Sequence, residues 1–455
     1  MHGVKQISII LLASAAMLLP AFFNGFPLVY SDTGAYIASG FEGSVPGDRP
    51  IFYGLFLRHA SLAHSLWFVV AAQAILLSAL LFYIFNTLLG PTKYGYRQFF
   101  ISILILSLCS SLPWFSSMLM ADVFTAISFL ILYILLFVTP SNRWVCGFLV
   151  LLYLLAAGTH LTHFPAHFAF LVGLAVLKLF KLQLLQGISW LKWTLISLLV
   201  AANLLVIPAV HFAHNGAWVM SKNGHLFLTA RFIESGAVKA YLDNECDAKP
   251  NFLCVYKDSL PNNGSDFLWL PESVLYKTGG WDSHAQEYKE MNKAIYTTAN
   301  YFQVYLVHFL KVLSFHVSAH RIGEELIPFQ LNSPPGWETE AHFKNELQSF
   351  LSAKQAQNYW PGKLNGLNQF LVVVLSLAVL LCLYVLYKPS TDNHIKLFVL
   401  SLCLCYAANF IVVCIASSGS RYNARMDWLF VFIAILSLIP KPNSKPNTQN
   451  LTLNT

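Results

Sequence analysis

Ten long apolar runs constrain the fold of this chain more than any other feature. They lie near residues 6–26, 66–89, 99–113, 119–138, 145–159, 164–180, 193–212, 367–387, 396–417 and 427–440. A helix crosses a bilayer core with about 20 apolar residues, and a lipid-exposed backbone has to satisfy its own hydrogen bonds. Only 11% of the residues are charged, whereas soluble domains have about 25%. The sequence therefore predicts an all-α, polytopic membrane protein with about ten transmembrane helices.

The runs divide the chain into an N-terminal transmembrane module, a polar insertion, a C-terminal transmembrane module and a tail. These parts are residues 1–210, 211–365, 366–440 and 441–455. The first module contains a polar loop at 27–65. In the insertion, turn signals give way near 288–318 to an aromatic helical pattern, which predicts an interfacial helix lying on the membrane. The short polar tail is expected to be disordered.

The cations give the orientation. With the N-terminus inside, eleven Lys and Arg residues fall in inner segments, and four fall in short outer loops: Arg49, Arg58, Arg421 and Arg425. Because cytoplasmic loops carry the excess of Lys and Arg, the loop 27–65 and the insertion are predicted to be extracytoplasmic. We expect a bacterial inner membrane with the functional residues on its periplasmic side. The net charge of +7 is largely this orientation signal and does not indicate a nucleic-acid partner.

The first outer loop has the densest group of chemically able residues. It contains Tyr30-Ser31-Asp32-Thr33-Gly34-Ala35-Tyr36 and Asp48-Arg49-Pro50-Ile51-Phe52-Tyr53-Gly54. Asp32 and Tyr36 are four residues apart, so a helix would place them on one face. A carboxylate near arginines at an interface is a candidate general base for an acceptor hydroxyl. The alternative is that Ser31 or Asp32 caps the N-terminus of an interfacial helix.

The outer arginines are candidates for holding phosphate. Arg49 and Arg58 can each bind phosphate in bidentate fashion, or they can pair with Asp48, Glu42 or lipid headgroups. Arg421 and Arg425, on either side of Tyr422, can share a helical face. Two like charges on one face repel unless an anion lies between them, although Asp427 could neutralise one of them.

Asp122, His160 and His163 complete the set of candidates. Asp122 is at the outer start of the run 119–138, where an acid is costly unless it is paired or functional; it could also interact with the helix N-terminus. His160 and His163 are close to His167. Together with Asp32 and Asp122 they could ligate a divalent metal ion, hydrogen-bond a leaving phosphate, or be satisfied by interfacial water.

Cys246 and Cys254 are the candidates for a disulfide. They lie eight residues apart in the polar insertion, and an oxidising compartment would allow them to pair. The other six cysteines lie in apolar runs, where a free cysteine behaves as a small hydrophobic residue.

The motifs around Asp32, Arg49, Asp122 and Arg421-Tyr422, in this order, resemble the GT-C glycosyltransferases, of the kind that includes dolichyl-phosphate-mannose-dependent mannosyltransferases. The resemblance implies that Asp32 is the catalytic base and that Asp122 helps to bind acceptor or metal. It also implies that the outer arginines hold a lipid-linked phosphate and that the long outer segment helps to form the acceptor site. The chain departs from the family because Asp32 has no acidic neighbour and histidines replace an acidic metal motif.

The resemblance thus implies a hexosyl or pentosyl transferase with inversion at the sugar carbon. Its partners would be a polyprenyl-phosphate-linked sugar, an acceptor that is a glycan, lipid or protein, and the bilayer; a divalent metal ion is the one cofactor left open. The alternatives are a flippase or transporter for a lipid-linked glycan, and an oligosaccharide polymerase or ligase. Span centres lack ionisable residues, which argues against ion-coupled transport.

Overall fold

The computed structural model describes residues 2–90, 94–138, 140–416, 419 and 421–440, and the regular secondary structure of these residues is helical apart from one isolated bridge. The predicted tail at 441–455 lies outside the described residues. The apolar part of the molecule is built from α1 (His2–Met17), α2 (Leu19–Asn24), α5 (Leu66–Leu89), α6 (Gly95–Cys109), α7 (Leu112–Ser117), α8 (Val123–Tyr133) with the π-helix η1 (Ile134–Val138), α9 (Arg143–Gly158), α10 (His163–Leu179), η2 (Gln183–Leu185), α11 (Trp190–Asn215), α20 (Asn365–Tyr387), α21 (Asn393–Ala416) and α22 (Arg421–Leu438).

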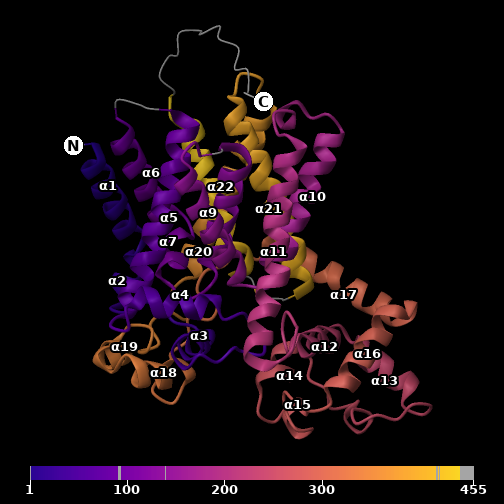
Figure 1. The fold of residues 1–455 in the computed structure, drawn as a ribbon. Coiled ribbons are helices and arrows are strands. Elements are labelled where there is room, and N and C mark those ends of the chain that lie inside the picture. The colour runs from indigo at the N-terminus through magenta and orange to yellow at the C-terminus, as the bar shows by residue number, and fades with distance from the viewer. Residues whose placement is uncertain (1, 91–93, 139, 417–418, 420, 441–455) are drawn as a thin grey trace.

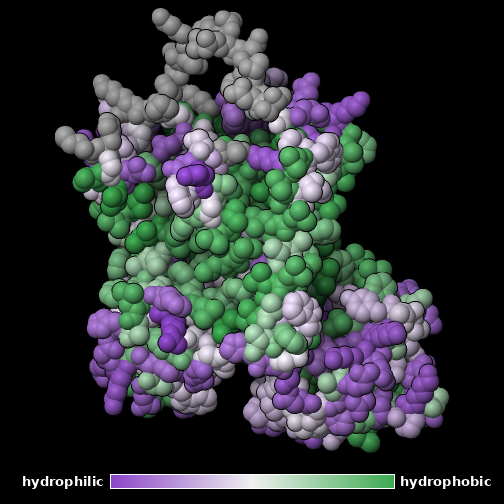
Figure 2. Space-filling view, viewed as in Figure 1, coloured by the Kyte–Doolittle hydropathy of each residue, from purple (hydrophilic) through white to green (hydrophobic). Residues whose placement is uncertain are grey.

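The remaining helices form two polar lobes at one end of the bundle (Figure 1). The first lobe consists of α3 (Ser31–Glu42), α4 (Phe52–Ser61), α18 (Pro334–His342), η4 (Lys344–Glu346) and α19 (Leu347–Ser352). The second lobe consists of α12 (Gly224–Ser235), α13 (Ala237–Glu245), η3 (Cys254–Tyr256), α14 (Gly264–Trp269), α15 (Val274–Lys277), α16 (Ala285–Thr297) and α17 (Ala299–Ser318). Figure 2 shows a hydrophobic belt across the bundle, with hydrophilic surface on both lobes and at the opposite end. This distribution is typical of a membrane protein.

Four helices are long and apolar enough to cross a bilayer: α5, α11, α20 and α21. The pair α9 and α10 bends by 120° at its break and adds a fifth candidate if it is counted as one span. Each of the ten predicted runs is mainly helical over its described residues, but a count of ten crossings is not confirmed. The reason is that several runs are short or broken: the first divides into α1 and α2, and α22 begins with Arg421, Arg425 and Asp427.

Backbone pairing attaches the first outer loop to the bundle. The amide of Leu28 donates to the Ser117 carbonyl at 2.9 Å, and the Leu28 carbonyl accepts from the Leu119 amide at 2.9 Å. The Thr33 hydroxyl, on the first turn of α3, donates to the Leu119 carbonyl at 3.2 Å. These bonds bring the N-terminus of α3 next to the start of α8, and thus bring Asp32 towards Asp122 although 90 residues separate them.

The insertion 211–365 divides between the two lobes instead of forming one unit. Its later part closes the first lobe, because α18 packs closely on α3: a Cβ added to Gly34 would lie 2.6 Å from the Pro334 carbonyl carbon. Glu346 then caps α5, accepting from the Ser65 hydroxyl at 2.5 Å and the Leu66 amide at 2.9 Å. A carboxylate is favourable there because the helix N-terminus carries partial positive charge.

The earlier part of the insertion forms the second lobe around a separate apolar core that includes Phe232 and Tyr305. The structure pairs Cys246 and Cys254, the candidate cysteines, in a disulfide. The lobe contacts α21, where the Arg231 guanidinium donates to the Cys414 carbonyl at 3.1 Å. α17 is not among the helices with the hydropathy for crossing, so its position on the membrane surface stays a prediction.

The two lobes should be accessible from the same side of the membrane, and the α10–α11 connection from the other. We expect an impermeant maleimide to label Ser259→Cys and Glu340→Cys in intact cells, because both exposed residues lie in the lobes. Gln186→Cys, exposed beside η2, should react only after permeabilisation. The parent chain with its native cysteines is the control. Equal labelling of all three positions in intact cells would contradict this topology.

Candidate functional site

Asp32 lies between two guanidinium groups that come from opposite ends of the sequence. Its Oδ1 is 2.9 Å from Nη1 of Arg49, in the loop before α4, and its Oδ2 is 3.5 Å from Nη2 of Arg421, at the start of α22. Tyr30 occupies the N-cap position of α3, so neither Ser31 nor Asp32 caps this helix. The carboxylate of Asp32, which is 24% exposed, is therefore held by the arginines.

The arginines determine the charge of Asp32. Burial by itself would raise the pKa of this carboxyl, but the Arg49 and then the Arg421 guanidinium outweigh burial and hold the pKa below its usual range. The side chain of Asp32 is therefore an anion at neutral pH. An anion held by two cations at the edge of the apolar belt can orient a hydroxyl, although a lowered pKa makes it a weaker base.

Arg49 connects Asp32 with Asp48. Its Nη2 and Nε donate to Oδ2 of Asp48 at 2.6 and 2.9 Å, and its guanidinium carbon is 5.4 Å from the ring centre of Tyr36. Tyr36 itself is buried against Tyr53. The four side chains Asp32, Tyr36, Asp48 and Arg49, all predicted from the first outer loop, thus form one group.

Arg421 is 5% exposed and binds a carboxylate that the sequence analysis did not select. Its Nη1 donates to Oε2 of Glu325 at 2.5 Å, while its Nη2 donates to the Tyr422 hydroxyl at 3.2 Å. Its buried Nε has no hydrogen-bond partner. Glu325 follows α17, and its side chain is 45% exposed. Burial raises the pKa of Glu325, and the Arg421 guanidinium offsets this only in part.

Arg425 is fully buried one helical turn after Arg421. Its Nη2 donates to the Asn409 side-chain oxygen at 2.7 Å and to the Thr162 hydroxyl at 3.3 Å, whereas Nε and Nη1 have no hydrogen-bond partner. The ring of Tyr422 faces both guanidinium groups, at 4.9 Å from Arg421 and 5.1 Å from Arg425. This cation–π contact helps two like charges to share a helix start.

Asp122 faces Arg425 without a direct hydrogen bond. The two side chains approach to 3.6 Å between Oδ1 and Nη1, and both atoms are buried and lack a hydrogen-bond partner. Asp122 is at the N-cap position of α8 but makes no side-chain capping bond. Its position still allows the expected charge interaction with the helix N-terminus, and the 3.6 Å separation from Arg425 leaves donors and an acceptor available.

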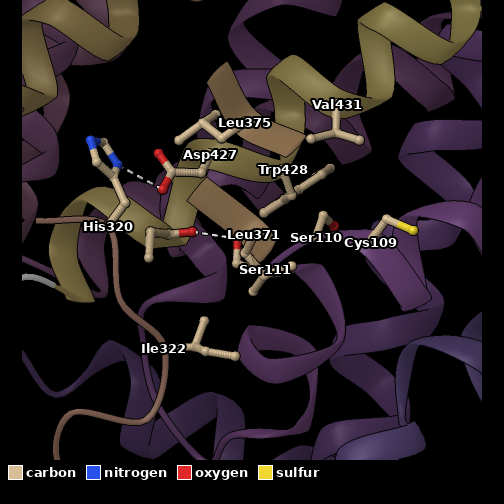
Figure 3. Close-up of a pocket in the computed structure, with 11 residues that line it drawn as sticks. Cys109, Ser110, Ser111, His320, Ile322, Leu371, Leu375, Asp427, Trp428 and Val431 are labelled. Carbon is tan, nitrogen blue, oxygen red and sulfur yellow. Dashed lines mark hydrogen bonds and ion pairs between the residues drawn. The ribbon is translucent and has the colours of Figure 1, made fainter. Parts of the chain in front are cut away.

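Asp427, which could have neutralised one of these arginines, has other partners in the structure. Asp427 accepts from His320 at 2.9 Å and from the Tyr406 hydroxyl at 2.7 Å, beside a small cavity on another side of α22 (Figure 3). The Ser111 hydroxyl donates to the Ala424 carbonyl at 2.6 Å. These contacts fix the start of α22 and so the positions of its two arginines.

The histidines have different surroundings. The ring of His160 lies 5.9 Å from that of Tyr422, and its Nδ1 accepts from the Thr162 amide and hydroxyl at 3.2 and 2.8 Å. His163 is bonded within the protein through both nitrogens, to the Thr125 hydroxyl at 2.8 Å and the Ala156 carbonyl at 3.1 Å. His160 therefore borders the group of charges, whereas His163 supports the packing of α10 on α8.

Two further expectations from the sequence need correction. Arg58 is not part of the group: it donates to the carbonyls of Gly40 and Phe41 at 3.1 and 3.4 Å, near the C-terminal end of α3, where a cation is favourable. The metal candidates Asp32, Asp122, His160 and His163 do not gather their ligand atoms into a metal-binding set within the described residues, where the one such group lies elsewhere.

Glu325, Asn409 and Thr162 are the site residues that sequence reasoning missed. Asn409 could have been identified from the sequence, because an amide inside an apolar run is costly unless it is bonded. For Glu325 the sequence shows only the acidic pair Glu324-Glu325 after a predicted helix, and this pair does not indicate which cation Glu325 contacts. Thr162 carried no signal beyond its position beside the histidines.

The Asp122–Arg425 pair should be needed for stability because removal of Asp122 leaves a buried guanidinium uncompensated. We expect Asp122→Asn to lower the free energy of unfolding by about 3 kcal/mol, measured by thermal and denaturant unfolding in detergent. Asp48→Asn, which removes one member of the more exposed Asp48–Arg49 pair, should cost less than about 1 kcal/mol. The double variant Asp122→Asn/Arg425→Gln should recover part of the loss. An Asp122→Asn protein as stable as the unsubstituted chain would show that the pair does not balance charge.

Comparisons of the chain with protein-family models, curated protein sequences and solved structures found no match.

Proposed function

We propose that this chain is a membrane glycosyltransferase similar to the GT-C enzymes. It transfers a hexose or pentose from a polyprenyl-phosphate donor to an acceptor hydroxyl of a glycan, lipid or protein. The observation that carries the proposal is the meeting of Asp32 with Arg49 and Arg421 at the edge between the first polar lobe, which contains α3, and the apolar bundle, which contains α22. An anionic headgroup with an apolar tail has to bind at such an edge, because its two parts require different surroundings.

The proposal includes a bundle of ten crossings with the site on the extracytoplasmic side of a bacterial inner membrane. Four helices are long and apolar enough to cross a bilayer. The further crossings in this proposal are α1 with α2, α6, α8 with η1, α9, α10 and α22. Support comes from their place in the bundle beside the four (Figure 1), and from the excess of cations in the inner segments.

Arg421 is the residue that we propose binds the donor phosphate. Two of its contacts are with carboxylates, and the more exposed of these is Glu325. A phosphate oxygen could replace Glu325 on Nη1 and also use Nε, which has no partner now. Guanidinium groups already in place stabilise the negative charge that develops on the leaving phosphate.

Asp32 would accept the proton of the acceptor hydroxyl. As the acceptor oxygen bonds to the anomeric carbon, the bond from that carbon to the donor phosphate breaks, and its electron pair stays on the phosphate. A single displacement of this kind inverts the sugar carbon. The donor phosphate also offsets the positive charge of Arg421, which helps to lower the pKa of Asp32. Donor binding would thus make Asp32 a better base.

Asp122 and Arg425 would complete the site from beneath. Arg425 is held by Asn409 and Thr162, and two of its nitrogens remain available next to Asp122. We assign Arg425 to the electrostatic stabilisation of the phosphate and Asp122 to keeping Arg425 in place. A polymerase or ligase would use the same charges on a larger donor, and a flippase would need cations along a path through the bundle. Arg421 and Arg425 instead lie one helical turn apart.

Substitutions at Asp32 and Arg421 should separate chemistry from binding. Asp32→Asn should lower the transfer rate by about 10²- to 10⁴-fold, because the proton acceptor is lost, and leave donor affinity within about twofold. Arg421→Ala should weaken donor binding by at least about tenfold, because a charge-assisted bond is lost. The measurements are transfer of label from radiolabelled polyprenyl-phosphate sugars and equilibrium binding of the same donors.

Two further variants serve as the controls for Arg421→Ala. Arg58→Gln removes an outer arginine that lies outside the site and should leave donor affinity unchanged. Glu325→Gln removes the competing carboxylate and should tighten donor binding about two- to fivefold. Equal loss of affinity in the Arg58 and Arg421 variants would indicate a general charge effect, and full transfer by Asp32→Asn would remove Asp32 from the mechanism.

The pH dependence of transfer should report the arginines around Asp32. Because the folded pKa of Asp32 is below its usual range, transfer should stay high as pH falls and decline only below the ordinary range of an aspartate. Arg49→Gln removes the first of the charges that lower this pKa, so the decline should move to higher pH. The rate is measured from about pH 2 to pH 8, so that the acidic limb of the unsubstituted chain, which lies below the ordinary aspartate range of about 3.9, falls inside the window. An acidic limb that stays in place in Arg49→Gln would contradict the role of Asp32 as the titrating base.

A further inference from the structure

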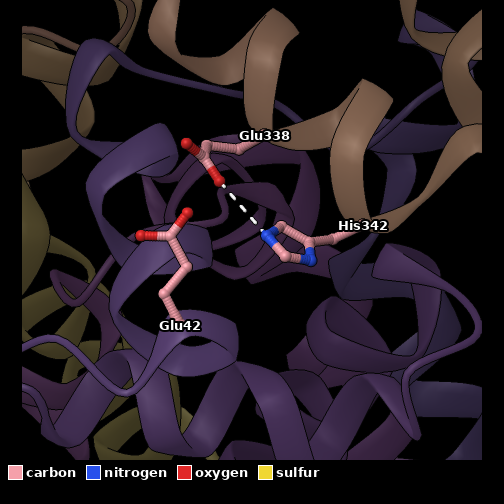
Figure 4. Close-up of side chains that lie close together, drawn as sticks. All are labelled: Glu42, Glu338 and His342. Atoms are coloured by element: carbon pink, nitrogen blue, oxygen red, sulfur yellow. Dashed lines mark ion pairs between the residues drawn. The ribbon is translucent and has the colours of Figure 1, made fainter.

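A second group of ionisable side chains lies at the opposite end of α3 from Asp32. Glu42 is the last residue of α3, and Glu338 and His342 lie on one face of α18. One ligand atom from each of the three lies within 4.8 Å of the other two, and Figure 4 shows the three side chains pointing towards one another. Among the residues that the structure describes, this is the one group that meets that criterion.

The spacing of Glu338 and His342 already suits a tetrahedral metal ion. Ligand bonds of about 2.1 Å at tetrahedral angles place ligand atoms about 3.4 Å apart, and Oε2 of Glu338 is 3.5 Å from Nε2 of His342. Glu42 is the exposed member of the group, so its side chain can rotate to close the remaining distance.

The group has unmet bonding capacity. Oε2 of Glu338 and Nε2 of His342 are both buried and have no hydrogen-bond partner, although they face each other. Two carboxylates also lie near one another, and their repulsion is costly unless a cation or a proton lies between them. A divalent cation would bond to the unpartnered atoms and balance the carboxylates.

We propose that Glu42, Glu338 and His342 bind one zinc-type divalent cation that fastens α18 to α3. Zinc takes both carboxylate oxygens and imidazole nitrogens as ligands, and a site with three protein ligands leaves the fourth position to water. The ring of His342 stacks on Phe41 of α3 at 4.8 Å, which keeps the imidazole in place. The ion would lie about 15 Å along α3 from Asp32, since a helix rises about 1.5 Å per residue. Its role is therefore structural.

The binding test uses the full chain in detergent, purified without a polyhistidine tag and equilibrated with Zn²⁺. We expect about one Zn²⁺ per chain by mass spectrometry, and binding at least about tenfold weaker in Glu42→Gln and in His342→Gln. Glu287→Gln is the matched control, because Glu287 pairs with His284 at 3.0 Å on the exposed surface of α16 without a third ligand. It should bind Zn²⁺ like the unsubstituted chain.

A second measurement excludes an effect of misfolding. Zn²⁺ should raise the melting temperature of the unsubstituted chain by about 2 °C or more, and a chelator should reverse the rise. Glu42→Gln changes an exposed residue at a helix end, so its fold should survive while its melting temperature no longer responds to Zn²⁺. Absence of bound Zn²⁺ in the unsubstituted chain, or equal binding by all variants, would overturn the proposal. Neither readout depends on sugar transfer.

Discussion

The central constraint on this structure is the cost of keeping guanidinium groups beside an apolar belt. Arg425 is fully buried and Arg421 nearly so, and each needs anionic or aromatic partners to remain charged there. Asp32, Asp122, Glu325 and Tyr422 supply these partners from four separate segments. Much of the architecture near the polar lobes, including the Leu28–Met118 bridge and the bonded amide of Asn409, serves to bring those segments together.

The arginines that stabilise the site also keep bonding capacity that a ligand could use. Arg421 is bonded to a half-exposed glutamate, and Arg425 approaches Asp122 without a hydrogen bond. An anion with stronger acceptors than Glu325 could enter without creating new buried cations, because the cations are already there. This is the reason for our proposal that the ligand is a phosphate.

The first lobe connects the two proposals through α3. One end of this helix carries Asp32, and the other carries Glu42 in the candidate metal group. α18 lies close against α3 because Gly34 lacks a side chain at the contact with Pro334. A cation at the far end of α3 would therefore restrict the position of Asp32 without touching any reacting atom.

The sequence by itself determined that the chain is helical and membrane-like, that most of the candidate charges lie in polar loops or at the ends of apolar runs, and which two cysteines are candidates for a disulfide, because composition, hydrophobic run length and local spacing express these properties directly. Only the tertiary structure decided that Arg49 and Arg421 share Asp32 while Arg58 binds carbonyl groups of α3, and that Glu325 joins the site. It also divided the insertion between two lobes and broke several runs into short helices. These outcomes depend on contacts between residues up to several hundred positions apart, and a single sequence records the residues at both ends of such a contact without recording that they meet.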